Sequence, residues 1–206
     1  MKKFLCALSC LSICLSNVCA SSLPAEVPIS AFAIGESAIG VQTFADIQKI
    51  FGAAKSVRIS KEDGADLVMC YVHIASKRKA FLIFESGEMG GSERYITGFR
   101  LSVLPPQWGC TPTTVEIGGL KTRNGIYLGQ ISKDFQSKFP IRFTRKAGDF
   151  RYEGSSRRVA TAEELKRIRS QWPDTSQDYF DVTISIEAKF GSDRLVDYRI
   201  RKIESF

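Results

Sequence analysis

Three short segments of the chain carry apolar side chains at the spacing of one helical face. Their apolar positions are Phe44, Ile47 and Phe51, then Ile131, Phe135 and Phe139, and finally Leu165, Ile168 and Trp172. The first and third segments begin with capping boxes, formed by Thr43 with Asp46 and by Thr161 with Glu164. Ser132 is the expected N-cap of the middle segment. Helix breakers end the three predicted helices, at Gly52, Pro140 and Pro173.

The segments that follow these helices have the composition of strands. Apolar and β-branched runs between polar or Gly-rich turns predict a first set at Val57–Ser60, Leu67–Ala75, Ala80–Glu85 and Tyr95–Leu104. In the second half, apolar and polar residues alternate from Phe180 to Glu187, which predicts a strand with one solvent-exposed face. A turn at Gly191-Ser192-Asp193 then leads into Leu195–Ile203, and the two strands are expected to form a hairpin.

The two halves of the chain match each other at three places in the same order. Asp46–Gly52 matches Asp134–Pro140, Val57–Gly64 matches Ile141–Gly148, and Phe99-Arg100-Leu101 matches Tyr198-Arg199-Ile200. The offsets are 88, 84 and 99 residues, and the larger last offset places an insertion in the second half, where the third helix lies. We therefore infer that one folding unit was duplicated.

The sequence thus predicts an α+β fold of two tandem repeats. Each repeat has a short N-terminal helix packed on a three- or four-stranded antiparallel sheet, and the second repeat has an extra helix. The expected boundaries are a signal peptide at 1–20, a loose N-terminal tail at 21–35, the first repeat at 36–104, a linker at 105–120 and the second repeat at 121–206.

This layout resembles that of the β-lactamase inhibitory proteins and of the small lipoprotein of the outer-membrane β-barrel assembly machinery. The similar features are a Gly-led helix that ends in Phe51-Gly52 or Phe139-Pro140 and strands that close in Phe-Arg-Leu or Tyr-Arg-Ile. The resemblance covers most of residues 36–206 and implies an inhibitor or an envelope-assembly accessory. The chain departs from both families. The inhibitors carry a disulfide in each half, whereas the second half here has no cysteine, and the lipoprotein has one repeat and a lipidated cysteine. No site residue is carried over.

The first twenty residues have the three parts of a secretory signal peptide. Lys2 and Lys3 give the positive start, Phe4–Leu15 the apolar middle and Val18-Cys19-Ala20 the small-residue exit. We expect cleavage near Ala20 and a periplasmic or secreted mature chain. No later run approaches the roughly 18 apolar residues of a membrane-spanning helix, so no transmembrane anchor is expected. Lipidation of Cys19 is the alternative, but the residues before it lack the small side chain that lipoprotein processing requires.

Four of the six cysteines lie in the predicted signal peptide, and Cys70 and Cys110 remain in the mature chain. An even number of cysteines in an exported protein favours a disulfide between them. The alternative is a free, nucleophilic cysteine, which needs an activating imidazole, and His73 is the only histidine in the sequence. We expect the disulfide.

Positive charge is concentrated in the second half. The formal net charge of +7 falls to +5 without Lys2 and Lys3, and residues 111–206 hold 18 basic and 13 acidic side chains. The candidate partner-binding residues are Arg142, Arg145, Lys146, Arg151, Tyr152, Arg157 and Arg158. Export makes nucleic acid an unsuitable partner, so acidic proteins, anionic lipids or acidic glycans are expected instead. The alternative is that these arginines line the solvated side of a strand pair.

Residues with catalytic or metal-binding potential are few. A single histidine excludes a His-rich zinc site, and strand parity makes His73 a surface residue. Gly35–Gly40 lacks the spacing of a serine nucleophile turn, and no phosphate-binding glycine loop or dinucleotide fingerprint is present. Glu85, Glu88 and Glu93 lack the alternating spacing of a calcium loop, so we expect a solvated hairpin there. No catalytic residue, metal or cofactor is expected.

Three functions follow from these observations. The first is an exported, non-enzymatic module that binds a protein in the envelope or the extracellular space, because two small sheets side by side offer a broad and shallow surface. The second is a binder of an anionic envelope surface such as lipopolysaccharide, peptidoglycan or acidic lipid. The third is a hydrolase of unknown type, which would need a deep pocket enclosing carboxylates.

Overall fold

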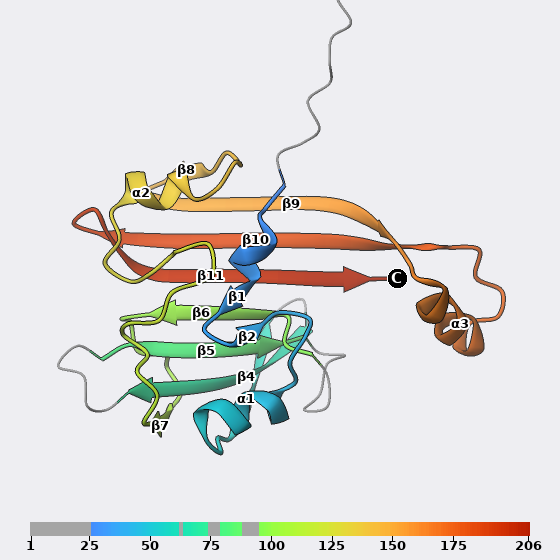
Figure 1. Cartoon of the computed structure of the whole chain (residues 1–206), viewed down its shortest axis with the longest axis horizontal. Helices are drawn as coiled ribbons and strands as arrows, with labels where there is room; N and C mark the ends of the chain where they lie inside the picture. The colour runs from blue at the N-terminus through green and yellow to red at the C-terminus, as the bar shows by residue number, and fades with distance from the viewer. Residues whose placement is uncertain (1–25, 62–63, 74–78, 88–94) are drawn as a thin grey trace, which may run out of the picture.

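The computed structural model describes residues 26–61, 64–73, 79–87 and 95–206 (Figure 1). The signal peptide predicted at 1–20 lies outside the described residues. The elements in chain order are η1, a 3-10 helix (Ile29–Phe32), β1 (Ala33–Ile34), β2 (Ser37–Ala38), α1 (Phe44–Phe51), β3 (Ser56–Lys61), β4 (Gly64–His73), β5 (Phe81–Ser86), β6 (Gly98–Ser102), β7 (Thr111–Thr113), α2 (Ser132–Ser137), β8 (Thr144–Lys146), β9 (Asp149–Val159), α3 (Ala162–Gln171), β10 (Tyr179–Gly191) and β11 (Arg194–Ser205). The α+β class is confirmed.

Nine strands form one sheet in the order β3-β4-β5-β6-β11-β10-β9-β8, with β7 beside β4. Neighbours along this path are antiparallel, whereas β7 runs parallel to β4. The two halves meet where β6 pairs with β11, and β1 and β2 form a separate ribbon. The sequence predicted a separate sheet for each half. The structure joins them because β6 and β11, the last sheet strands of each set, satisfy each other's backbone hydrogen bonds along the shared edge.

Each half contains a helix followed by four antiparallel strands. In the first half α1 precedes β3, β4, β5 and β6, and in the second α2 precedes β8, β9, β10 and β11. The helix predicted as an insertion, α3, lies between β9 and β10. In Figure 1 η1, α1 and α2 lie in front of the sheet, and α3 projects beyond one end of the long strands.

Helix α1 forms where the capping box and the apolar face predict it. The Thr43 hydroxyl accepts a hydrogen bond from the Asp46 backbone, and the Asp46 carboxylate accepts one from the Thr43 backbone. Hydrogen bonds from Lys49 and from Thr43 lower the pKa of Asp46 to about 2. The helix ends at Gly52, whose φ of 96° is in the left-handed region that glycine adopts without strain. Its apolar face is buried through Phe44, Ile47 and Phe51.

The other two helices differ in detail from the prediction. Helix α2 has Ile131 rather than Ser132 as its N-cap, because Ile131 is extended and pairs with Arg194. Helix α3 has the predicted capping box, but Trp172 follows the helix as its C-cap and is 58% exposed. The expected apolar face of α3 is therefore reduced to Ile168, with Leu165 half-buried.

The main core lies between the sheet and the segments in front of it. It includes residues from the helices and from both sets of strands. The described part of the segment expected as a loose tail, residues 26–35, belongs to this core. Ala31 and Ile34 are fully buried, and Val27 and Phe32 are nearly so, because their apolar side chains fill the space over the sheet.

The segment expected as a linker, 105–120, pairs with and packs against the first half. Its strand β7 pairs with β4, Ile117 is fully buried, and the Thr113 hydroxyl donates a hydrogen bond to the Phe51 carbonyl. The predicted disulfide between Cys70 and Cys110 is present, which indicates an oxidising compartment. Among the described helices, none has the length and apolar character needed to cross a bilayer.

Candidate binding surface

The two faces of the sheet differ in what covers them. On β6, β10 and β11, alternate side chains such as Phe99, Ile186 and Tyr198 point into the core beneath η1, α1 and α2. Because strand side chains alternate between faces, the residues between them point to the opposite side. We call this side of β6, β9, β10 and β11 the open face. Its side chains include Arg100, Arg151, Glu153, Ser155, Arg157, Val159, Asp181, Thr183, Ser185, Glu187, Lys189, Asp197, Arg199, Arg201 and Ile203.

Five charged side chains meet in the middle of the open face, where β6 pairs with β11. We call them the central cluster: Glu85, Arg100, Asp197, Arg199 and Arg201. The Arg100 Nε and Nη2 atoms donate to Asp197 at 2.6 and 2.9 Å, and the Arg199 Nε and Nη2 atoms donate to Glu85 at 2.9 and 2.7 Å. The Arg201 Nε atom lies 3.3 Å from the same Glu85 carboxylate.

The carboxylates of the central cluster are buried and the guanidinium groups partly exposed. The Asp197 and Glu85 side chains are 6% and 5% exposed, whereas those of Arg100 and Arg199 are 26% and 24% exposed. Bidentate pairing holds each guanidinium plane in a fixed orientation. The cluster therefore presents arginines that are already ordered to whatever approaches the open face.

A shallow depression of about 190 Å³ adjoins the central cluster on the side of the first half. Its walls combine apolar side chains, Trp108 among them, with charged ones. Trp108 packs on a small second core on this face, beside the Cys70–Cys110 disulfide. The lining residues are Ile59, Val68, Ile83, Glu85, Arg100, Trp108 and Arg199.

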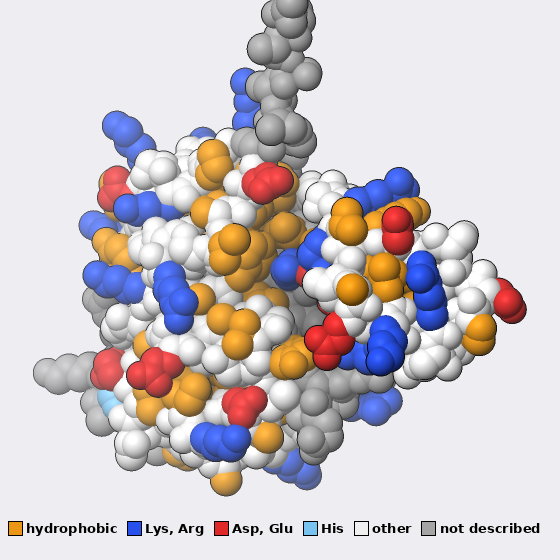
Figure 2. Space-filling model, turned by 45° about the vertical axis from the view of Figure 1, so that its right-hand side comes forward, with side chains coloured by type: hydrophobic (Ala, Val, Ile, Leu, Met, Phe, Trp, Pro, Cys, Tyr) orange, Lys and Arg blue, Asp and Glu red, His pale blue; other side chains and the backbone are white. Residues whose placement is uncertain are grey.

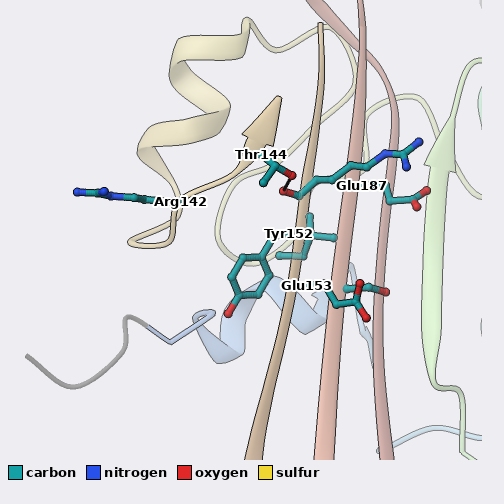
Figure 3. A pocket seen from close by; sticks show the side chains of 8 residues that line it. Arg142, Thr144, Tyr152, Glu153 and Glu187 are labelled. Carbon is teal, nitrogen blue, oxygen red and sulfur yellow. Dashed lines mark hydrogen bonds between the residues drawn. The ribbon is translucent and has the colours of Figure 1, made fainter. Parts of the chain in front are cut away.

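A second depression, of about 480 Å³, lies where β8 begins beside β9. It brings together three of the residues proposed from the sequence, Arg142, Arg151 and Tyr152. Figure 3 shows that Arg142 and Tyr152 lie on one side of β9 and that Glu153 and Glu187 lie on the other. The lining residues therefore come from both sides of β9, and they include arginines as well as glutamates. The depression is open to solvent.

Arg145 and Lys146 are exposed on the short strand β8. The Arg145 guanidinium lies 4.4 Å from the centre of the Phe150 ring and donates to Gln136 at 3.0 Å. These contacts fix Arg145 on the helix-covered side, because Phe150 belongs to the main core. Figure 2 shows Lys and Arg interspersed with Asp and Glu on the side of the molecule that it presents, without a wide area of one sign.

Arg157 and Arg158 are neighbours on β9 and therefore point to opposite faces. Arg157 lies on the open face and pairs with Asp181 at 3.2 Å. Arg158 lies on the other face and pairs with Glu164 of α3 and with Glu204 of β11. Its hydrogen bonds lower the pKa of Glu164 to about 2 and raise that of Arg158 itself. The seven proposed residues are thus divided between the two faces.

Sequence reasoning missed the central cluster, although one signal pointed to it. The matched segments Phe99-Arg100-Leu101 and Tyr198-Arg199-Ile200 each place an arginine between two apolar residues. In a strand, that pattern puts the arginine on the face away from the core. The prediction that Glu85 lies in a solvated hairpin is wrong, because Arg199 and Arg201 hold it buried. Glu88 and Glu93 lie outside the described residues.

The other candidate chemical groups have structural partners. His73 was expected on the surface, but its side chain is 12% exposed, and its Nδ1 atom lies 2.9 Å from Glu116. Strand β7 pairs with β4 at this position, with Thr113 directly beside His73 in the register. In the part of the chain that the structure describes, no group of three His, Cys, Asp or Glu residues is placed to hold a metal ion. Comparison of the chain with protein-family models, with curated proteins and with solved structures found no match.

Proposed function

We propose that the chain is an exported, non-enzymatic module that binds another protein through the open face. The observation that carries this proposal is the central cluster, in which arginines are ordered by buried carboxylates beside the Trp108 ring. Arginine and tryptophan are the residues that most often dominate the binding energy of protein interfaces, especially near the centre of the contact. A broad sheet surface with shallow depressions suits a protein partner better than a small molecule.

Export fits the same proposal. The predicted signal peptide would be cleaved near Ala20 and release the mature chain into the periplasm or the medium. The Cys70–Cys110 disulfide supports this location, because such bonds persist in oxidising compartments. The role suggested by the resemblance, an inhibitor or an envelope-assembly accessory, requires a partner in that location.

The register at the sheet centre supports the proposal that one unit was duplicated. Arg100 lies directly opposite Arg199, Phe99 opposite Ile200 and Leu101 opposite Tyr198. The sequence match relates Phe99 to Tyr198, Arg100 to Arg199 and Leu101 to Ile200. A twofold rotation axis between Arg100 and Arg199 would place each residue of one segment on its sequence match in the other. The same rotation leaves the β6–β11 pairing unchanged. Duplication would therefore have placed the two equivalent arginines together at the middle of the open face.

The binding of an anionic envelope surface is the second candidate. It is favoured by the exposed side chains of Arg142, Arg145 and Lys146, which lie together along the chain in and before β8. The open face itself is a weaker match, since Arg151 and Arg157 alternate there with Glu153, Asp181 and Glu187. A surface of mixed sign is better suited to a specific protein than to a uniformly charged layer.

A pull-down from the envelope extract of the exporting cell tests the first candidate. The baits are the mature chain, a Ser185→Trp variant that sets a bulky ring beside Arg201 of the central cluster, and a Ser170→Trp control on the exposed surface of α3. We expect one partner to be recovered in high salt by the wild type and the control and lost with Ser185→Trp. Equal recovery by all three baits would contradict the proposal.

Vesicles that contain anionic lipid test the second candidate. If it holds, the mature chain binds them at low salt and is released as salt screens the charges. Charge reversal of Arg142, Arg145, Lys146 and Arg151 would then abolish binding, while Ser170→Trp on α3 would leave it unchanged. Absence of vesicle binding at low salt would remove this candidate.

A further inference from the structure

The edge strand β9 has a free side over most of its length. It pairs with β10 from Phe150 to Val159, but β8 covers its other side only at residues 149–151. Within the described residues, no strand pairs with Tyr152–Val159 on that side. In Figure 1, β9 forms the upper edge of the sheet, and β8 lies beside only one end of it.

The matching strand of the first half is protected differently. Strand β4 pairs with β3 along residues 64–69, and β7 then pairs with residues 71–73 on the same side. In the second half, β8 takes the place of β3 but contains three residues, and no described strand takes the place of β7. Long free edges are normally avoided, because their unpaired backbone groups invite another strand.

The backbone groups that face this edge can be assigned. The Thr144 hydroxyl on β8 donates to the Arg151 carbonyl at 3.0 Å, so this carbonyl points away from β10. Because the strand repeats every two residues, the backbone groups of Glu153, Ser155 and Arg157 point the same way. The centre of the edge is also flat, since Gly154, Ser155 and Ser156 carry little or no side chain.

We propose that β9 pairs with β9 of a second copy of this chain, in antiparallel register centred on Ser155. In this register Glu153 lies opposite Arg157 of the second copy, and Arg157 lies opposite Glu153 of the second copy, so two ion pairs form on the open face. Tyr152 lies opposite Arg158 of the second copy on the other face. The charged side chains that usually protect a sheet edge are here self-complementary.

Neighbouring registers lack this complementarity. A shift of one residue would place opposed side chains on opposite faces of the sheet. A shift of two residues toward the N-terminus sets Arg157 against Arg151 of the second copy, which already pairs with β8. A shift of two the other way sets Glu153 against Val159 and Arg157 against Ser155. In the proposed dimer, the strand order continues through β9 into the second sheet, and both open faces lie on the same side.

Sedimentation equilibrium of the mature chain over a range of micromolar concentrations tests this inference. We expect a reversible monomer–dimer equilibrium. Glu153→Arg and Arg157→Glu should each raise the dissociation constant by about tenfold or more, because each sets like charges opposite one another. The double variant exchanges the two partners, so it should dissociate less readily than either single variant. Its recovery should be partial, because Arg157→Glu also sets a carboxylate beside Asp181.

Matched controls separate this edge from other surfaces. Glu163→Arg and Arg167→Glu make the same charge changes on the exposed surface of α3 and should leave the dissociation constant unchanged. A wild-type chain that is monomeric at every concentration overturns the proposal. So does a dimer that is insensitive to the single reversals, or a double variant that dissociates as readily as the single variants.

Discussion

Phe135 is the buried residue through which helix α2 packs on the core of the second half. It is fully buried, and its ring lies 5.2 to 6.0 Å, between centroids, from five other rings. We predict that Phe135→Ala lowers the free energy of unfolding by about 3–5 kcal/mol, because the lost burial adds to the energy of the cavity left behind. Urea unfolding of the variant and the wild type measures this difference.

Phe135→Leu is the matched control for this prediction. It keeps most of the apolar volume, so we expect a loss well below that of the alanine variant. If Phe135→Ala lowered the free energy of unfolding by less than about 0.5 kcal/mol, the range of ordinary surface substitutions, packing of this ring would not hold the helix on the sheet.

At the residue scale, the sequence predicts core positions better than site positions. Phe44, Ile47 and Phe135 are recognisable because helical spacing depends only on nearby residues. The importance of Arg100 and Arg199 depends on which strand lies beside theirs, and this pairing joins residues about a hundred positions apart. Trp172 shows the opposite error, since its spacing fits the helical face although it lies past the last turn, exposed to solvent.

At the scale of elements, α3 is held to the sheet by Arg158. Its guanidinium group contacts Glu164 at 3.0 Å and Glu204 at 2.6 Å. Burial alone would raise the pKa of Glu204, but hydrogen bonds from Arg158 and Lys202 bring it below its ordinary value. The hydrogen bond from Arg158, with that from the Thr161 backbone, lowers the pKa of Glu164 to about 2.

A pH dependence follows from the lowered pKa of Glu164. A carboxylate whose pKa is lower in the folded state contributes stability above its unfolded value, here near 4.5, and loses it as the pH falls toward about 2. We predict that Glu164→Gln lowers the melting temperature at pH 7 and that the gap to the wild type closes by pH 2. Thermal unfolding of both proteins across this range measures the gap. A gap that stays constant with pH would show that the ion pair does not stabilise the fold.

Capping and alternation determine which elements are predictable. The helices α1 and α3 form where their capping boxes lie, and the alternating segment from Phe180 forms most of β10. The burial of residues 26–35 and the fastening of the 105–120 segment were not predicted, because both depend on contacts with distant strands. Residues rich in Pro and Gly indicate that a segment is irregular, but they do not indicate which part of the fold the segment packs against.

At the scale of the whole molecule, the Cys70–Cys110 disulfide links strand β4 to a residue 40 positions later in the chain. We predict that replacing both cysteines by alanine lowers the free energy of unfolding by about 4 kcal/mol, since the unfolded chain gains the freedom that the bond removes. Denaturant unfolding of the double variant, compared with the oxidised wild type, gives this value. Equal stabilities would mean that the loop is held by β7 and its packing alone.

The central claim is that the open face is where this protein binds its partner. Site-specific photo-crosslinking in the cell that produces the protein tests it most directly, with the crosslinker placed at Thr183 on the open face and, in a control, at Lys166 on α3. We predict a specific adduct with another protein from Thr183 and none from Lys166. An adduct from Lys166 alone, or equal capture from both positions, would contradict the claim.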